Sequence, residues 1–269
     1  MNRNPLMTVV TVSYNAAATI EKTIQSVLSQ SYSNIEYIII DGGSTDGTVD
    51  IIKKYADRIA CWVSEPDKGI YDAMNKGILK STGQWINFMN VGDWFNNDNV
   101  ISELVSSIDN DATIVYGDII KMLPDIQYYE KAESLDLLKE KMVFSHQAMF
   151  VRTDYHKQHL FDLSFRSSAD YNFIYNSYFK GKVLFQYIPL LIANYDESDG
   201  MSKDNWILAY RENYKVWGIE NDKKKLLIME YKLFKIRLRK LIKRILPDFL
   251  NLKIQRFLLE NRGYNVVMK

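Results

Sequence analysis

Short apolar runs along the chain alternate with stretches in which apolar residues recur every three or four positions. The runs are typical of buried β-strands and occur at 7–12, 35–40, 59–63, 85–89, 113–117 and 147–151. The three- and four-residue spacings are typical of amphipathic helices and occur at 19–29, 48–55 and 72–79. Strands that alternate with helices predict βαβ units. We therefore expect an α/β fold with helices flanking a central, mainly parallel sheet.

The last part of the chain has a different pattern. Apolar residues follow one another at alternating spacings of four and three, which places them on one helix face: Leu227, Tyr231, Phe234, Leu238, Leu241 and Ile245. Basic residues flank this stripe until Pro247, which ends the helix. We expect a main domain over 1–204 and a basic, amphipathic helical extension over 205–269.

Charge divides the chain in the same way. The net charge is only +1, but residues 221–269 hold 14 Lys and Arg against 4 Asp and Glu. A basic amphipathic helix is typical of binding to an anionic membrane surface. Alternatively, the stripe packs on the acidic body or forms a homodimer, since this spacing also suits a helical seam. We expect no nucleic acid as a partner, because the aromatic residues lie within the apolar stripe.

Composition narrows the class of protein. With 47% hydrophobic and 25% charged residues and 5 prolines, the chain is typical of a folded globular protein. Its single cysteine, Cys61, excludes an internal disulfide. Neither a signal peptide nor an apolar run of the ~20 residues needed to span a membrane is visible. The expectation is a cytoplasmic protein, peripheral at the inner face of the cell membrane.

A Gly-rich polar turn follows the second expected strand. Residues 38–48 read Ile-Ile-Ile-Asp-Gly-Gly-Ser-Thr-Asp-Gly-Thr, so that Asp41 ends the apolar run. Ligands of open α/β sheets bind at the carboxyl ends of strands, and Gly42 and Gly43 allow close backbone approach. We expect a small-molecule site here. The alternative is that Asp41 only closes a turn.

Three further motifs accompany this turn. They are Thr-Val-Ser-Tyr-Asn (11–15), Glu-Pro-Asp-Lys-Gly-Ile-Tyr-Asp-Ala-Met-Asn-Lys-Gly (65–77) and Asn-Val-Gly-Asp-Trp-Phe (90–95). Their order over roughly residues 7–200 resembles the inverting family 2 glycosyltransferases of the GT-A fold, of the type that builds bacterial polysaccharides. The resemblance implies a Rossmann-like sheet and a hexosyltransferase that uses a nucleotide-sugar donor and a glycan or lipid-linked acceptor. The alternative is a catalytically silent nucleotide-sugar-binding protein of the same fold.

The resemblance also implies roles on the donor side. The strand end and the ring of Tyr14 would hold the base, while Asp41 would bond the base or ribose. Asp72 and Asn75 share one helix face, which would bind ribose, sugar hydroxyls and phosphate if it faces the cleft. If it points outward, it is an ordinary solvated face. The implied donor-binding residues are Val12, Tyr14, Asn15, Asp41, Gly43, Lys68, Gly69, Asp72, Asn75 and Asn90.

The family's acidic motif after the fourth strand implies Mn²⁺ or Mg²⁺, which would neutralise the diphosphate leaving group. Here that motif reads Asn-Val-Gly-Asp, and only Asp93 is acidic. Asp93 is therefore the candidate metal ligand, acting with waters and the diphosphate. Asn90 would lie near the sugar or the metal.

The catalytic base implied by the resemblance is Asp170, in Ser-Ser-Ala-Asp-Tyr at 167–171. It would take the proton of the acceptor hydroxyl during attack on the anomeric carbon. The alternative is that Asp170 caps a helix over 171–179. His146 resembles an acceptor-side residue that binds phosphate or sugar oxygen, although a lone histidine is often a structural residue.

Overall fold

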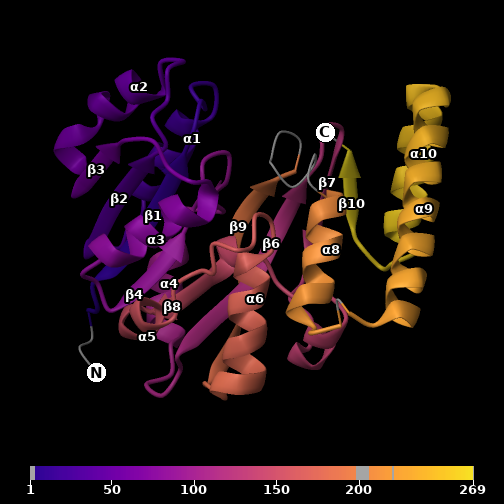
Figure 1. Ribbon diagram of the computed structural model, residues 1–269. Helices are drawn as coiled ribbons and strands as arrows, with labels where there is room; N and C mark the ends of the chain where they lie inside the picture. The colour runs from indigo at the N-terminus through magenta and orange to yellow at the C-terminus, as the bar shows by residue number, and fades with distance from the viewer. Residues whose placement is uncertain (1–3, 198–205, 220, 269) are drawn as a thin grey trace.

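The computed structural model describes residues 4–197, 206–219 and 221–268 of the 269-residue chain. Within these ranges a ten-stranded sheet forms the centre of the molecule (Figure 1). The strands are β1 (Met7–Ser13), β2 (Ile35–Asp41), β3 (Cys61–Ser64), β4 (Trp85–Phe88), β5 (Trp94–Phe95), β6 (Ile114–Met122), β7 (Ile126–Glu130), β8 (Met149–Arg152), β9 (Phe185–Asp196) and β10 (Val266–Met268). The helices are α1 (Ile20–Leu28), α2 (Thr48–Lys54), α3 (Ile70–Lys80), α4 (Val100–Ser107), α5 (Thr153–Gln158), α6 (Ala169–Asn176), α8 (Trp206–Val216), α9 (Lys223–Ile245) and α10 (Asp248–Glu260).

The sheet is mixed. Its main path runs β10-β7-β6-β8-β4-β1-β2-β3, with β9 beside β6 and β5 beside β9. Strands β3, β2, β1 and β4 are parallel, as their alternation with helices predicts. Strand β8 runs antiparallel to β4 and β6, and the short turn after Met122 makes β7 antiparallel to β6. The expected parallel arrangement therefore describes the N-terminal strands and the β6–β9 pair, whereas β8, β7 and β10 are antiparallel to their neighbours.

Helices cover both faces of the parallel half. Ile38 and Ile40 of β2 pack in one apolar cluster with Met74 of α3, whereas Ile39 packs in another with Ile24 of α1. Successive side chains of a strand point to opposite faces, so a strand covered on both sides needs apolar residues at every position. This explains the unbroken run of isoleucines that ends at Asp41.

Three expected elements differ in their bounds. The strand expected at 113–117 is β6, which continues to Met122 because it pairs with β9 along most of its length. The strand expected at 147–151 begins at Met149, after a 3₁₀ turn over His146–Ala148. The helix expected at 171–179 is α6, followed by a π-helical turn over Ser177–Gly181.

The C-terminal extension contacts the main domain at two places. Val216 at the end of α8 packs in the same apolar cluster as Ile174 of α6. Strand β10 pairs antiparallel with β7, so the extension adds a strand to the sheet (Figure 1). The domain boundary predicted at 204/205 lies outside the described residues and stays a prediction. In the part of the chain that the structure describes, no helix is long and apolar enough to cross a bilayer.

Candidate active site

The carboxyl ends of the parallel strands meet at Asp41. Ser13, at the end of β1, donates to Oδ1 of Asp41 at 2.9 Å, and Ser64, at the end of β3, donates to Oδ2 at 2.7 Å. Ser44 donates to Asp41 through both its hydroxyl and its amide, and Gly43 through its amide. The fully buried carboxylate therefore joins three strand ends to one turn.

These bonds decide the charge of Asp41. Burial by itself raises the pKa of the carboxyl, but the hydrogen bonds from Ser44, Ser64 and Ser13 outweigh it and lower the pKa below its ordinary value. Asp41 is thus an ionised anchor that shapes the turn, which is the turn-closing alternative of the sequence analysis. Direct contact of Asp41 with a base or ribose stays a prediction.

Tyr14 and Asn15 lie beside this turn. The side-chain oxygen of Asn15 accepts a hydrogen bond from the backbone amide of Thr45 at 2.9 Å. The backbone amide of Asn15 donates to the hydroxyl of Ser44 at 2.7 Å. Asn15 has a φ of 46°, a left-handed conformation that asparagine tolerates better than most residues. The Tyr14 ring is 65% exposed and lies against Gly42, so one aromatic face is open to a ligand. Val12 is buried, and its carbonyl accepts the amide of Val91.

The loop before α3 packs against the same turn. Gly43 has a φ of 82°, and a Cβ built on it would lie 3.3 Å from the backbone nitrogen of Pro66, so the two loops touch through their backbones. Lys68 and Gly69 are exposed at the N-terminus of α3. The Lys68 amide donates to Asp72 at 3.0 Å, and Asp72 keeps 20% of its side chain exposed. The loop that carries these residues borders the turn, and their contact with a donor stays a prediction.

The prediction that Asn75 faces the cleft is wrong. Its amide nitrogen donates to the carbonyl of Phe161 at 2.9 Å, and its oxygen accepts the amide of Phe161 at 2.9 Å. Asn75 is only 8% exposed. Both ends of the side chain are therefore used to hold the loop before α6. Helical spacing places Asn75 near the face of Asp72, but the loop from α5 covers it.

Asp93 follows β4 and is buried. Its Oδ2 accepts Nε2 of Gln147 at 2.7 Å, and its Oδ1 accepts the amide of Asp196 at 3.1 Å. Burial raises the pKa of the Asp93 carboxyl to about 7, although the Gln147 hydrogen bond and the nearby His146 oppose this. Asp93 thus ties the end of β4 to β9 and to the turn before β8.

This environment does not fit the predicted role of Asp93 as a metal ligand, because both carboxylate oxygens are engaged by protein donors and water has little access. In the same motif, Oδ1 of Asn90 is buried and has no hydrogen-bond partner among the described residues. Across the residues that the structure describes, no three His, Cys, Asp or Glu side chains are grouped to hold a metal ion. The donor set lacks the one or two carboxylates that Mg²⁺ usually takes from a protein.

Asp170 and His146 lie together. Nδ1 of His146 is 3.1 Å from Oδ2 of Asp170, while the hydroxyl of Tyr71 donates to Oδ1 at 2.9 Å. The other nitrogen of His146, Nε2, lies 3.0 Å from Nδ2 of Asn90. The structure therefore brings together the predicted base, the predicted acceptor-side histidine and the asparagine at the end of β4.

The charge of Asp170 follows from these contacts. Burial raises the pKa of the carboxyl, but the hydrogen bonds from His146, the Tyr71 hydroxyl and the Tyr171 amide outweigh it, so the pKa is lowered. Its side chain is 14% exposed. Ser168 occupies the N-cap position of α6, and Asp170, the second helical residue, accepts the backbone amide of Tyr171 at 2.9 Å, so it also satisfies an N–H of the first turn. Asp170 is thus an ionised, partly accessible proton acceptor.

Two residues of this region are absent from the sequence-based predictions. Tyr71, on α3, looks like a core residue by its apolar neighbours, yet its hydroxyl bonds Asp170. Glu212, on α8, is 8% exposed and accepts the amides of three successive residues that lead into α6: Arg166, Ser167 and Ser168. Each contact joins distant parts of the chain, so no local pattern marks it.

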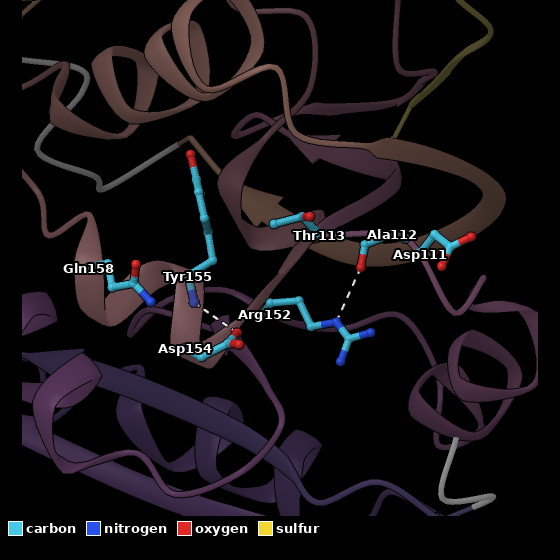
Figure 2. Close-up of a pocket in the computed structure, with 7 residues that line it drawn as sticks. All are labelled: Asp111, Ala112, Thr113, Arg152, Asp154, Tyr155 and Gln158. Carbon is cyan, nitrogen blue, oxygen red and sulfur yellow. Dashed lines mark hydrogen bonds between the residues drawn. The ribbon is translucent and has the colours of Figure 1, made fainter.

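A separate pocket of about 300 Å³ lies at the opposite end of β4 (Figure 2). It is lined by Asp111, Ala112, Thr113, Arg152, Asp154, Tyr155 and Gln158. Arg152 pairs with Trp85 at the start of β4, whereas Asn90 lies beyond the end of that strand. The Arg152 guanidinium donates to the carbonyl of Ala112 and lies over the Trp85 ring. None of the predicted site residues lines this pocket.

Comparison with known proteins identifies the family. The family described as Glycosyl transferase family 2 matches residues 8–170, which include Asp41, Asp93, His146 and Asp170. The chain belongs to this family. Its relatives carry the same activity in their names, and the protein is a glycosyltransferase.

Two curated relatives illustrate the similarity. A PGL/p-HBAD biosynthesis glycosyltransferase of Mycobacterium bovis is 28% identical over 204 residues, which cover 74% of this chain and 79% of the relative. An uncharacterized glycosyltransferase of Mycobacterium tuberculosis is 33% identical over 181 residues, which cover 65% and 69%.

Solved structures share the fold of this family 2 glycosyltransferase. S. aureus TarS bound to UDP-GlcNAc superposes with a TM-score of 0.61 at 15% identity, covering 78% of this chain and 64% of that chain. A mannosyltransferase from Pyrobaculum calidifontis, in complex with GDP-Man and Mn²⁺, gives 0.62 at 16% identity, covering 77% and 61%. The chain thus spans less than two thirds of either structure. The similarity establishes the GT-A fold.

Proposed function

We propose that this glycosyltransferase moves one sugar from a nucleotide-diphosphate donor to a hydroxyl of a glycan or lipid-linked acceptor, with inversion at the anomeric carbon. The observation that carries the proposal is the ionised carboxylate of Asp170, held by Tyr71 and His146 beside Asn90. A proton acceptor next to the strand ends is what direct displacement by a hydroxyl requires.

In the proposed reaction, Asp170 takes the proton of the acceptor hydroxyl as its oxygen bonds the anomeric carbon. The bond from that carbon to the diphosphate oxygen breaks on the opposite face, and the nucleoside diphosphate leaves. Proton transfer of this kind typically contributes ~10²–10⁴-fold to the rate. His146 and Tyr71 hold the carboxylate in place by donating to its two oxygens.

On the donor side, the exposed ring of Tyr14 provides the surface on which a base stacks. Asp41 shapes the turn that borders the nucleotide through its bonds to Ser44 and Gly43. Lys68 and Gly69 lie in the exposed loop directly before α3, and Lys68 supplies a cationic side chain close to the diphosphate. Two of the solved structures with this fold hold UDP-GlcNAc and GDP-Man, which supports a nucleotide-sugar donor.

The predicted Mn²⁺ or Mg²⁺ is assigned no carboxylate ligand, because Asp93 is buried and hydrogen-bonded. Because the mannosyltransferase complex contains Mn²⁺, the effect of added manganese on nucleotide binding is measured directly. The reaction above uses only side chains of this protein.

We place the enzyme in surface polysaccharide or glycolipid synthesis, peripheral at the inner face of the cell membrane. The name of the mycobacterial relative, which refers to PGL/p-HBAD biosynthesis, and the basic extension both support this setting. The catalytically silent binder is set aside, since the family and the names of the relatives support a transferase enzyme.

The test is calorimetric titration of UDP, GDP, dTDP and CDP into the full chain, with and without manganese. The matching nucleotide-sugars are then assayed for transfer to lipid-linked and soluble glycans. Binding of one nucleotide and transfer of its sugar with inverted configuration support the proposal. Absence of binding to all four, in a protein that is folded by circular dichroism, contradicts it.

A further inference from the structure

Helix α9 has two apolar faces, and only one of them packs on the protein. On the first face, Met229 and Leu233 are buried in a cluster with Tyr214 of α8. The second face is the stripe predicted from the sequence, and its members are 45–75% exposed: Leu227, Tyr231, Phe234, Leu238 and Leu241. The sixth member, Ile245, has a side chain outside the described residues. We name these five residues the exposed stripe.

The two faces point in different directions. At roughly 100° per residue, the centre of the exposed stripe lies more than about 100° around the helix from Met229 and Leu233. α9 therefore contacts α8 without covering the exposed stripe. The packing of Met229 and Leu233 lies within the C-terminal extension, and the exposed stripe takes no part in it.

Exposed apolar residues are concentrated in this part of the molecule. Of 17 large apolar side chains that are exposed among the described residues, 11 lie between Leu227 and Val267. Scattered exposed leucines are ordinary on a protein surface, whereas a continuous apolar row marks an interaction site. The exposed stripe is left uncovered by the described residues, as is typical of an interaction surface.

The charge around the exposed stripe defines the kind of partner. α9 contains ten Lys and Arg and a single acid, Glu230, which pairs with Arg211 of α8 at 3.4 Å. Lys235 and Arg237 are exposed and flank the exposed stripe on its two sides. A second copy that paired through the same stripe would bring ten more cations against these ten, and like charges repel. An anionic surface is complementary in both charge and apolar character.

We propose that the exposed stripe of α9 binds an anionic lipid surface, with its apolar side chains among the acyl chains and its basic flanks at the head groups. The inference rests on the proposed membrane setting and identifies the surface that provides it. Because β10 pairs with β7 and α8 packs on α6, α9 is attached to the same sheet that carries the active site. Binding would thus bring the active site to the bilayer, where lipid-linked acceptors lie.

The experiment is co-sedimentation of the full chain with vesicles of phosphatidylcholine, either pure or mixed with phosphatidylglycerol. The stripe variant is Tyr231→Gln, Phe234→Gln and Leu238→Gln together, which keeps good helix formers on α9. Its matched control, Leu79→Gln, Leu163→Gln and Leu184→Gln, removes three equally exposed leucines elsewhere. A charge variant, Lys232→Gln, Lys235→Gln and Arg237→Gln, tests the electrostatic part. Nucleotide binding is measured for each protein.

The wild type and the matched control are expected to bind the mixed vesicles and not the neutral ones. The stripe variant is expected to bind roughly 10-fold more weakly for each side chain removed. The charge variant is expected to lose about fivefold per residue. Unchanged nucleotide binding in all four proteins separates this inference from the proposed transfer reaction.

Two results would overturn the inference. One is equal vesicle binding by the wild type and the stripe variant. The other is a doubled mass in light scattering of the wild type, lost in the stripe variant, without binding to either kind of vesicle. That second result would assign the exposed stripe to a second copy of the chain.

Discussion

Nδ1 of His146 lies 3.1 Å from Oδ2 of Asp170. Since an ionised carboxylate only accepts hydrogen bonds, Nδ1 carries the proton, and Nε2 accepts from the amide of Asn90 at 3.0 Å. A histidine predicted to contact the acceptor is therefore also bonded to the candidate base. Substitution of each residue alone can therefore distinguish a base at position 170 from a positioning or acceptor-binding role of His146.

Asp170→Asn is expected to lower the transfer rate by at least ~10²-fold, because the amide cannot take the proton of the acceptor. Nucleotide binding should stay within a small factor of wild type, since the hydrogen-bond partners of Asp170 do not include the turn of Asp41. The rate is measured with saturating donor, and binding by calorimetry. Asp57→Asn, which changes an exposed acid in the 3₁₀ turn before β3, is the matched control. A variant that transfers sugar at the wild-type rate removes Asp170 from the role of base.

His146→Ala is expected to lower kcat by about 10–100-fold, the range for losing a hydrogen bond to a charged group. His146→Gln keeps an amide donor and should recover part of the loss. The KM for the acceptor should change little in either variant, if His146 acts by positioning Asp170. His159→Gln, on an exposed histidine, is the control. A raised acceptor KM with unchanged kcat would instead support the predicted contact with phosphate or sugar oxygen.

The part of the site that the sequence predicts is the part formed by strand ends. Asp41 was placed correctly at the end of β2, because a continuous apolar run followed by Gly-Gly marks a doubly covered strand and a turn. Its bond to Ser64 was not predicted, because it depends on β3 lying beside β2 in matching register. In the other half, the strands at 113–117 and 147–151 were predicted, but their antiparallel pairing and the hairpin of β6 with β7 were not, since β7 has mixed polarity and no helix separates it from β6.

Asn75 shows where pattern reasoning fails. The spacing of Asp72 and Asn75 predicts a shared helix face, and this is a statement about one helix alone. What covers that face depends on Phe161, 86 residues further along the chain. Glu212 is a similar case, since an acid on an amphipathic helix resembles an ordinary solvated residue. Contacts of this kind follow from tertiary packing, which a single sequence does not reveal.

Glu212→Gln is expected to destabilise the protein by about 1–3 kcal/mol. The carboxylate accepts hydrogen bonds from the amides of Ser167 and Ser168, whereas the NH₂ group of glutamine is itself a donor and would leave an N–H without an acceptor. The loop it holds leads into the first turn of α6, so transfer should fall further than nucleotide binding. The free energy of unfolding is measured in urea and the rate in parallel. The control is Glu230→Gln, which changes an exposed acid of α9. An unchanged unfolding free energy would contradict the positioning role of Glu212.

His156 gives the protein a built-in sensitivity to acid. The side chain is fully buried, its ring stacks on Phe173 at a centroid distance of 4.3 Å, and Nε2 has no hydrogen-bond partner. Burial lowers the pKa of His156 to about 4, although the hydrogen bond to the His159 carbonyl opposes this. The folded protein therefore holds a neutral imidazole at pH values where the unfolded chain binds a proton.

His156→Phe should flatten the pH dependence of stability below neutrality. Between the unfolded pKa near 6.5 and the folded pKa of about 4, the unfolded state binds more protons, so stability falls as the pH is lowered. The loss is on the order of 3 kcal/mol and is complete near pH 4. Phenylalanine keeps an aromatic ring beside Phe173 and cannot be protonated. Unfolding free energies of both proteins are compared at pH 7.5 and pH 5, and parallel losses in the two would show that other groups cause the acid sensitivity.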